Sequence, residues 1–150
     1  MPTPSAVPGS VSRVPAAGPD LAEVMAALEA AGTEQTRKTY ARHGVEAPMF
    51  GVSFATLKTL SKRIRTDHDL ALALWQTGNF DARNLAVKVV DPARLTRAEL
   101  DHWSQDRGAR MCSSHVAQVA AEGPHAHACV ASWLASSNED QLIIGWKLVG

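Results

Sequence analysis

The sequence predicts an all-α fold built from helix pairs that repeat along the chain, and two observations support this prediction. Ala and Leu dominate the apolar residues, while Phe, Trp and Tyr make up only 5% of the 150 residues. This mixture is typical of packed helices rather than sheets. Three segments also share one layout, in which a helix ends near a tryptophan and a short polar break precedes a second, apolar helix.

Tryptophans mark the repeat. Trp75, Trp103 and Trp133 lie 28 and 30 residues apart, and Thr96 and Glu99 form a capping-box pattern at the start of the middle unit. A helix-pair period of about 30 residues predicts a curved α-solenoid, because each unit can bury its apolar face only against its neighbours. We expect the three tryptophans to be the packing anchors of successive units.

The N-terminal part of the chain divides into a leader and two helices. Residues 1–19 contain five of the eight prolines, which predicts a disordered leader ahead of a repeat domain over residues 20–150. Asp20 is a candidate N-cap for a helix that ends at Gly32, and a second helix ends at Gly44.

A connector with Pro48 and Gly51 then leads to an amphipathic helix over residues 53–65. Three helix pairs follow, over residues 68–90, 97–120 and 127–149. The last helix, 139–149, is apolar nearly all round, whereas a terminal repeat normally has a polar outer face. We therefore expect either self-association through this helix or a repeat domain that is incomplete at its C-terminus.

Basic residues gather in one window although the net charge of the chain is zero. Residues 33–65 hold seven of the fifteen Lys and Arg residues and only two acids, Glu34 and Glu46. Such a segment predicts a face that attracts phosphate groups, with an ordinary solvated helix surface as the alternative. The basic residues of this window are Arg37, Lys38, Arg42, Lys58, Lys62, Arg63 and Arg65.

The sequence also lacks several signals. No stretch approaches the 18 or more apolar residues of a membrane span, and the N-terminus has no secretory pattern. With only Cys112 and Cys129, we expect reduced thiols and a cytoplasmic protein. No phosphate-binding loop or hydrolase elbow is present, and we expect no cofactor.

The segment from Cys112 to His115 contains the residue types of a nucleophilic or metal site. A thiol three residues before an imidazole could be a nucleophile with its base, but Cys112 shares an apolar stripe with two valines, where a thiol is usually a buried hydrophobe. Together with His125, His127 and Cys129, the pair matches no common zinc spacing. We expect no metal, and we expect His125 and His127 to lie in a solvated loop.

The stretches "YARHGVEAPMFGVSFATLKTLSKRI" and "DHDLALALWQTGNFDARNLAVKVVDP" resemble the AlkD-type DNA alkylation repair proteins. The marks are Gly51 and Val52 before the Lys-rich helix, the Leu-Trp helix end followed by Asp81 and Arg83, and "WLASSN" before the last helix. The similarity runs from about Thr36 to the end of the chain. It implies a curved superhelix of HEAT-like helix pairs, in a family whose characterised members excise N3- and N7-alkylated purines as DNA glycosylases.

An alkylated purine already carries positive charge, so it leaves without a general acid. A carboxylate suits the two tasks that remain, which are to stabilise the oxocarbenium-like sugar and to place a water. In the family, an Asp and a Trp four residues before it serve this purpose, and these positions read Ser113 and Ala109 here. An Arg of the next unit is also replaced, since residues 142–144 are Leu, Ile and Ile. The resemblance therefore implies the fold of the family without its recognised catalytic centre.

Three functions follow from these observations. The first is a protein that binds duplex DNA through the basic window and Arg83, with little or no glycosylase activity. The second is an active glycosylase with a relocated acid, for which Asp106 is the better candidate and Asp81 the other. The third is a protein-binding scaffold without a role on nucleic acid, which would not need the basic window.

Overall fold

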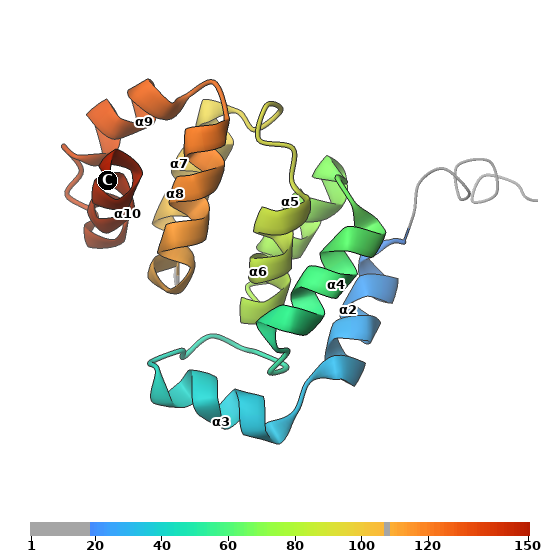
Figure 1. Cartoon of the computed structure of the whole chain (residues 1–150). Coiled ribbons are helices and arrows are strands. Elements are labelled where there is room, and N and C mark those ends of the chain that lie inside the picture. Colours follow the sequence, from blue (N-terminus) through green and yellow to red (C-terminus); the bar gives the residue numbers. More distant parts are fainter. Residues whose placement is uncertain (1–18, 107–108) are drawn as a thin grey trace, which may run out of the picture.

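A computed structural model describes residues 19–106 and 109–150, and within these ranges every regular element is a helix. Figure 1 shows the helices packed side by side along the chain. The expected leader lies outside the described residues except for Pro19. The elements are α2 (Leu21–Ala31), α3 (Glu34–Arg42), α4 (Phe54–Ile64), α5 (His68–Gln76), α6 (Phe80–Val89), α7 (Arg97–Gln105), the 3-10 turn η1 (Ala109–Cys112), α8 (Ser113–Glu122), α9 (Ala126–Trp133) and α10 (Glu139–Val149).

Short polar side chains begin most of these helices. Each accepts a hydrogen bond from the backbone N–H three residues later and so satisfies one of the unpaired donors of the first turn. The capping boxes at Asp20 and Thr96 are complete, because Glu23 and Glu99 each accept a hydrogen bond from the backbone N–H of their cap. Both capping predictions are confirmed. The capping residues are Asp20, Thr33, Ser53, Asp67, Asn79, Thr96 and Asn138.

The helices form two layers. α4, α6, α8 and α10 are neighbours in one layer, which we call the second-helix layer, while α2, α5, α7 and α9 form the other. The helices of the second-helix layer run in the same direction, and α3 lies below the first turns of α4 and α6 in the view of Figure 1. The predicted helix-pair solenoid is therefore confirmed for the described residues.

The three repeated tryptophans are core residues, as expected. Trp75, Trp103 and Trp133 are buried, and the rings of Trp75 and Trp103 stack with centroids 4.5 Å apart. Two of the three tryptophans also donate their indole N–H to a carboxylate: Trp75 donates to Asp106 and Trp133 donates to Asp101. Buried aromatic rings with a bonded polar tip hold the neighbouring pairs together.

The end of the chain differs in part from the sequence expectation. His127 lies within α9, so the loop predicted for it is wrong, whereas His125 lies in the turn after Pro124 as the N-cap residue of this helix. Gly145 is needed at its position in α10, because a Cβ there would lie 3.0 Å from the Cβ of Trp133. Trp146 and Val149 are exposed on the same helix. Among the described residues, no helix is long and apolar enough to cross a membrane.

Candidate nucleic-acid interface

The basic residues of α4 do not share one face. On a helix of about 100° per residue, Lys58 lies about 40° from Phe54 and Lys62 about 80°, while Arg63 lies about 180° away. Arg63 lines a hollow against α2 with Glu23, on the opposite side from Phe54. Lys58 and Lys62 are exposed beside the face of α4 that looks towards α8. The structure thus separates Arg63 from the two lysines.

The remaining residues of the basic window have local partners or lie at helix ends. Arg37 donates to the carbonyl of Phe50, and Lys38 forms an ion pair with Glu34 at 3.4 Å. Arg42 donates to the hydroxyl of Thr39. Arg65 ends α4 with a positive φ of 66°. These side chains are exposed, but those of α3 belong to a helix that lies outside the second-helix layer.

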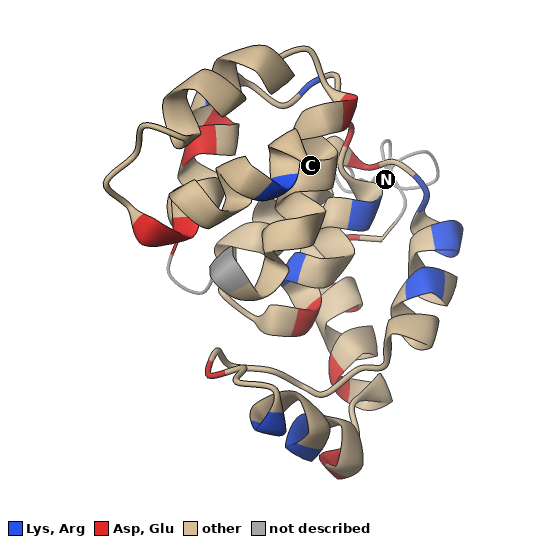
Figure 2. Cartoon of the chain, turned by 60° about the vertical axis from the view of Figure 1, so that its left-hand side comes forward, with Lys and Arg blue, Asp and Glu red and all other residues tan. Residues whose placement is uncertain are grey.

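Two lysines outside the predicted window complete a row in the second-helix layer. Lys62, Lys88 and Lys147 are the ninth residues of α4, α6 and α10. Gln118 of α8 lines one hollow with Lys88 and another with Lys147, and Ser61, next to Lys62, lines the first of these hollows, so the three lysines lie on the same side of the layer. In α8 the ninth position is Ala121, which is exposed. Figure 2 shows that basic positions are spread over several helices rather than gathered in one block.

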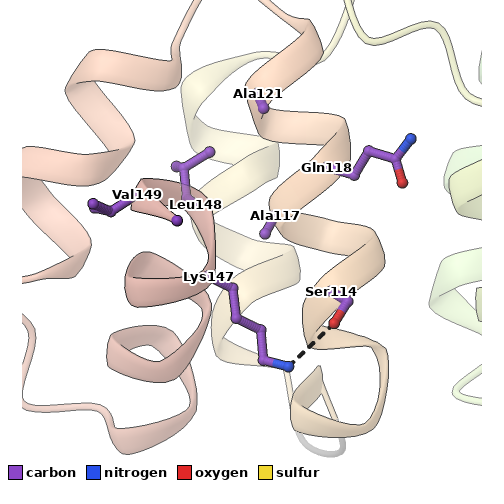
Figure 3. A pocket seen from close by; sticks show the side chains of 8 residues that line it. Ser114, Ala117, Gln118, Ala121, Lys147, Leu148 and Val149 are labelled. Atoms are coloured by element: carbon purple, nitrogen blue, oxygen red, sulfur yellow. Dashed lines mark hydrogen bonds between the residues drawn. The ribbon is translucent and has the colours of Figure 1, made fainter.

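The register of the repeats was the signal that could have identified Lys88 and Lys147. Each is isolated from other basic residues along the sequence, so a search for charge clusters passes over it. Lys147 donates to the hydroxyl of Ser114 at 3.1 Å across the groove between α10 and α8, as Figure 3 shows. Lys88 lines a hollow of about 340 Å³ between α4, α6 and α8.

An aromatic pair lies beside this hollow. The rings of Phe54 on α4 and His115 on α8 stack with centroids 6.2 Å apart and an angle of 25° between their planes. Phe54 is 45% exposed, so part of its ring is open to solvent. Burial lowers the pKa of His115, and the charge of Lys88 lowers it further, so the imidazole is neutral at neutral pH.

A buried carboxylate fixes the start of α4. Asp81 accepts hydrogen bonds from the backbone N–H groups of Phe50, Gly51 and Val52, at 2.6, 3.0 and 2.9 Å. Gly51 has a φ of 81°, and a Cβ there would lie 2.7 Å from the backbone oxygen of Thr33, the N-cap residue of α3, so only glycine fits without a shift. These contacts give a structural reason for Gly51 in the connector, where Gly51 and Val52 are part of the resemblance to the family. Since Asp81 is fully buried, it cannot act as the relocated acid.

The carboxylate of Asp106 is also held by contacts with residues of neighbouring helices. Its Oδ2 accepts from the indole N–H of Trp75 at 2.5 Å and lies 3.4 Å from an Nη of Arg83, and its Oδ1 lies 3.4 Å from His102. Arg83 is 8% exposed and stacks over the Trp75 ring at 4.6 Å. Arg83 is therefore an interior residue, and we leave it out of the candidate DNA-contacting set.

The segment from Cys112 to His115 contains no carboxylate. Ser113 is 5% exposed and Ser114 is exposed, and the side chain of Ala109 lies outside the described residues. Cys112 is buried, and its thiol lies 3.5 Å from the amide oxygen of Asn84. Burial raises the pKa of Cys112 to about 11, which opposes a role as a nucleophile. Within the described ranges, no three His, Cys, Asp or Glu residues are arranged to hold a metal ion.

Comparisons with known proteins match this architecture. The family model described as DNA alkylation repair enzyme matches residues 24–146. A solved structure described as "a new family of proteins related to the HEAT-like repeat DNA glycosylases with affinity for branched DNA structures" is 33% identical, with a TM-score of 0.81. The alignment covers 87% of this chain and 56% of that one, so the chain spans little more than half of the relative's length. No curated protein gives a significant match.

Proposed function

Because the chain belongs to the DNA alkylation repair enzyme family, we propose that it binds DNA through its second-helix layer and does not excise alkylated bases. The proposed ligand, DNA, is the one expected for the family, and the proposed contacts are made by exposed lysines of this chain. It rests most of all on the shared ninth position of Lys62, Lys88 and Lys147 in three neighbouring helices. Lys58, one turn before Lys62, adds a fourth positive charge.

A row of lysines at repeat spacing suits a phosphate backbone. Each ammonium group that neutralises a phosphate releases a condensed counterion, which provides much of the free energy of binding at low salt. Lys62 and Lys88 form no ion pair with any residue of the described ranges, and Lys147 bonds to a neutral hydroxyl. The three charges are therefore available to DNA. We assign Arg37, Lys38, Arg42, Arg63 and Arg65 a secondary role, because they lie on α3 or away from the Lys58 face of α4.

The absence of base excision follows from the residues at the expected catalytic position. Ser113 cannot supply negative charge to an oxocarbenium-like sugar, and Asp81 and Asp106 are held in hydrogen-bonded positions. Loss of one strong electrostatic stabiliser costs about 3–4 kcal/mol of transition-state stabilisation. An active glycosylase using Asp106 would have to break the contacts of this carboxylate with Trp75 and Arg83.

We extend the proposal to branched DNA. The solved relative is described as having affinity for branched DNA structures, and at 33% identity this chain has the corresponding fold. Branched DNA offers phosphate backbones in several directions, so an extended row of lysines can contact more phosphates there than on one duplex arm. The proposed ligand is therefore DNA with a branch point, with plain duplex bound more weakly.

The test is a binding titration of the full chain across a salt series. The probes are a four-way junction, a matched duplex and a duplex containing N7-methylguanine, which is also assayed for released base. We expect binding to all three, tightest for the junction, with no base released. Lys88→Gln and Lys147→Gln should each reduce the salt slope by about one unit.

Arg94→Gln is the matched control. Arg94 lies in the turn before α7, where its guanidinium is 3.9 Å from Asp69 of the other layer, so its loss should leave the slope unchanged. Failure to bind any probe at low salt would contradict the proposal and leave a protein-binding scaffold. Released base would instead revive the glycosylase hypothesis, with Asp106→Asn as the next variant.

Two further expectations accompany this proposal. A cytoplasmic location is consistent with Cys112 and Cys129, which are both buried free thiols. Self-association through residues 139–149 is suggested by the exposed Trp146 and Val149. Sedimentation of the wild type and of Trp146→Gln over a range of concentrations tests self-association. A mass that does not depend on concentration would exclude it.

A further inference from the structure

We infer that the hollow between α4, α6 and α8 binds one unpaired nucleotide, whose base stacks on the aromatic pair formed by His115, which lines the hollow, and Phe54 beside it. The inference rests on the proposed DNA binding and names the part of branched DNA that this site would recognise. A branch point or a bulge exposes bases outside a continuous stack, whereas a matched duplex exposes none. The site would therefore bind a branch point or a bulge in preference to a matched duplex.

The aromatic pair is the first argument. Phe54 and His115 come from helices of different repeats, and their rings lie nearly parallel, 25° apart. Phe54 also contacts Tyr40, whose ring centroid lies 5.8 Å away with an angle of 54° between the ring planes. An exposed ring that is fixed by its neighbours loses little entropy when a base stacks on it, and stacking on an aromatic ring tolerates any base.

The lining of the hollow is the second argument. His115 lines it together with Ser61, Lys88, Gln118 and Glu122. Gln118 donates to Glu122 at 3.2 Å, so an amide and a carboxylate lie together at the surface of α8. A base edge presents both donors and acceptors, which these two groups complement. A bare phosphate would instead be repelled by Glu122 while being attracted by Lys88.

The charges around the hollow are the third argument. Lys88 lies close enough to His115 to lower its pKa, and Lys58 is one helical turn from Phe54. A nucleotide whose base stacks on Phe54 would thus have ammonium groups within reach of its own phosphate. Because the imidazole is neutral at neutral pH, His115 contributes a stacking plane rather than a charge.

The test uses duplexes with a single-nucleotide bulge and matched duplexes without it. The bulged base is 2-aminopurine, whose fluorescence falls when it stacks on another ring. We expect the wild type to prefer the bulge and to quench its fluorescence on binding. Phe54→Leu and His115→Gln should each lower the affinity for the bulge by about five- to a hundredfold, the range measured for loss of one base–aromatic stack. Neither should change the matched-duplex affinity or the salt slope.

His127→Gln on α9 is the control for His115→Gln, because His127 is exposed in the other layer. Phe54→Leu keeps an apolar side chain against Tyr40, so circular dichroism should show an unchanged helix content. Equal affinity of the wild type for bulged and matched DNA, or unquenched fluorescence in the complex, would overturn the inference while the proposed DNA binding stands. Absence of binding to either duplex would overturn both.

Discussion

Trp75 donates its indole N–H to Asp106, which lies 31 residues later at the end of α7. Asp101, earlier in the same helix, accepts the indole N–H of Trp133 from α9. α7 is therefore bonded through carboxylates to the first helix of the pair before it and to the first helix of the pair after it. The same contact removes Asp106 from consideration as a free acid.

Asp106→Asn should destabilise the fold without affecting any reaction. The amide can still accept from Trp75, but it removes the negative charge that lies 3.4 Å from the buried Arg83 guanidinium. We expect a loss of about 1–3 kcal/mol in the free energy of unfolding, measured by urea denaturation. Asp69→Asn is the control, since its side chain is 89% exposed. A stability equal to that of the wild type would contradict the structural role of Asp106.

Two glycines with positive φ should respond differently to alanine. Gly51 (φ 81°) has backbone atoms of α3 within 2.8 Å of an added Cβ, whereas Gly44 (φ 95°) has nothing within 4 Å. Gly44→Ala should cost about 1 kcal/mol from backbone strain alone. Gly51→Ala adds a clash and disturbs the N–H groups that Asp81 accepts from. Its thermal melting temperature should fall clearly below that of Gly44→Ala, and equal melting temperatures would refute the close approach.

Adjacent serines at the start of α8 should tolerate aspartate unequally. Ser113 is 5% exposed, so Ser113→Asp places a carboxylate in the interior and should cost several kcal/mol without restoring base excision. Ser114→Asp should be neutral or slightly stabilising, because Ser114 is exposed and already bonds to Lys147. It should, however, weaken DNA binding by neutralising that lysine. Chemical denaturation and base-release assays on both variants check these outcomes.

The two thiols should be unreactive in the folded protein. Burial raises the pKa of Cys112 and of Cys129 from about 9 to about 11. The unfolded chain therefore releases these protons first, so the free energy of unfolding should fall as the pH rises from about 9 towards 11. At pH 7.5 a thiol reagent should label neither cysteine until urea is added. Rapid labelling of Cys112 under native conditions would show that it is accessible.

The helices and their core were predictable from the sequence because their signals are local. The caps at Asp20 and Thr96 need only neighbouring residues to be recognised, and the tryptophan period is read directly along the sequence. The candidate site was not predictable in the same way. Arg83 looked like a surface cation, yet α6 lies at the centre of the stack and Phe80 to Ala86 are all buried. Its partner Asp106 lies on another helix, 23 residues away, which no local pattern indicates.

Charge clustering also gave an incomplete view of the basic surface. It grouped Arg63 with Lys62, although adjacent residues on a helix point about 100° apart. It passed over Lys88 and Lys147, whose relationship to Lys62 becomes visible only when the helices of successive repeats are aligned. Packing of parallel helices converts that shared position into a shared face.

Ala121 interrupts the row of lysines in the second-helix layer. Each phosphate contact adds roughly one unit to the salt dependence of binding and slows dissociation, so a row with a gap holds DNA for a shorter time than a complete one. The exposed position could accept a longer side chain without disturbing the core. Under the proposed mode of DNA binding, Ala121→Lys should lengthen the residence time on DNA, because it would add one phosphate contact.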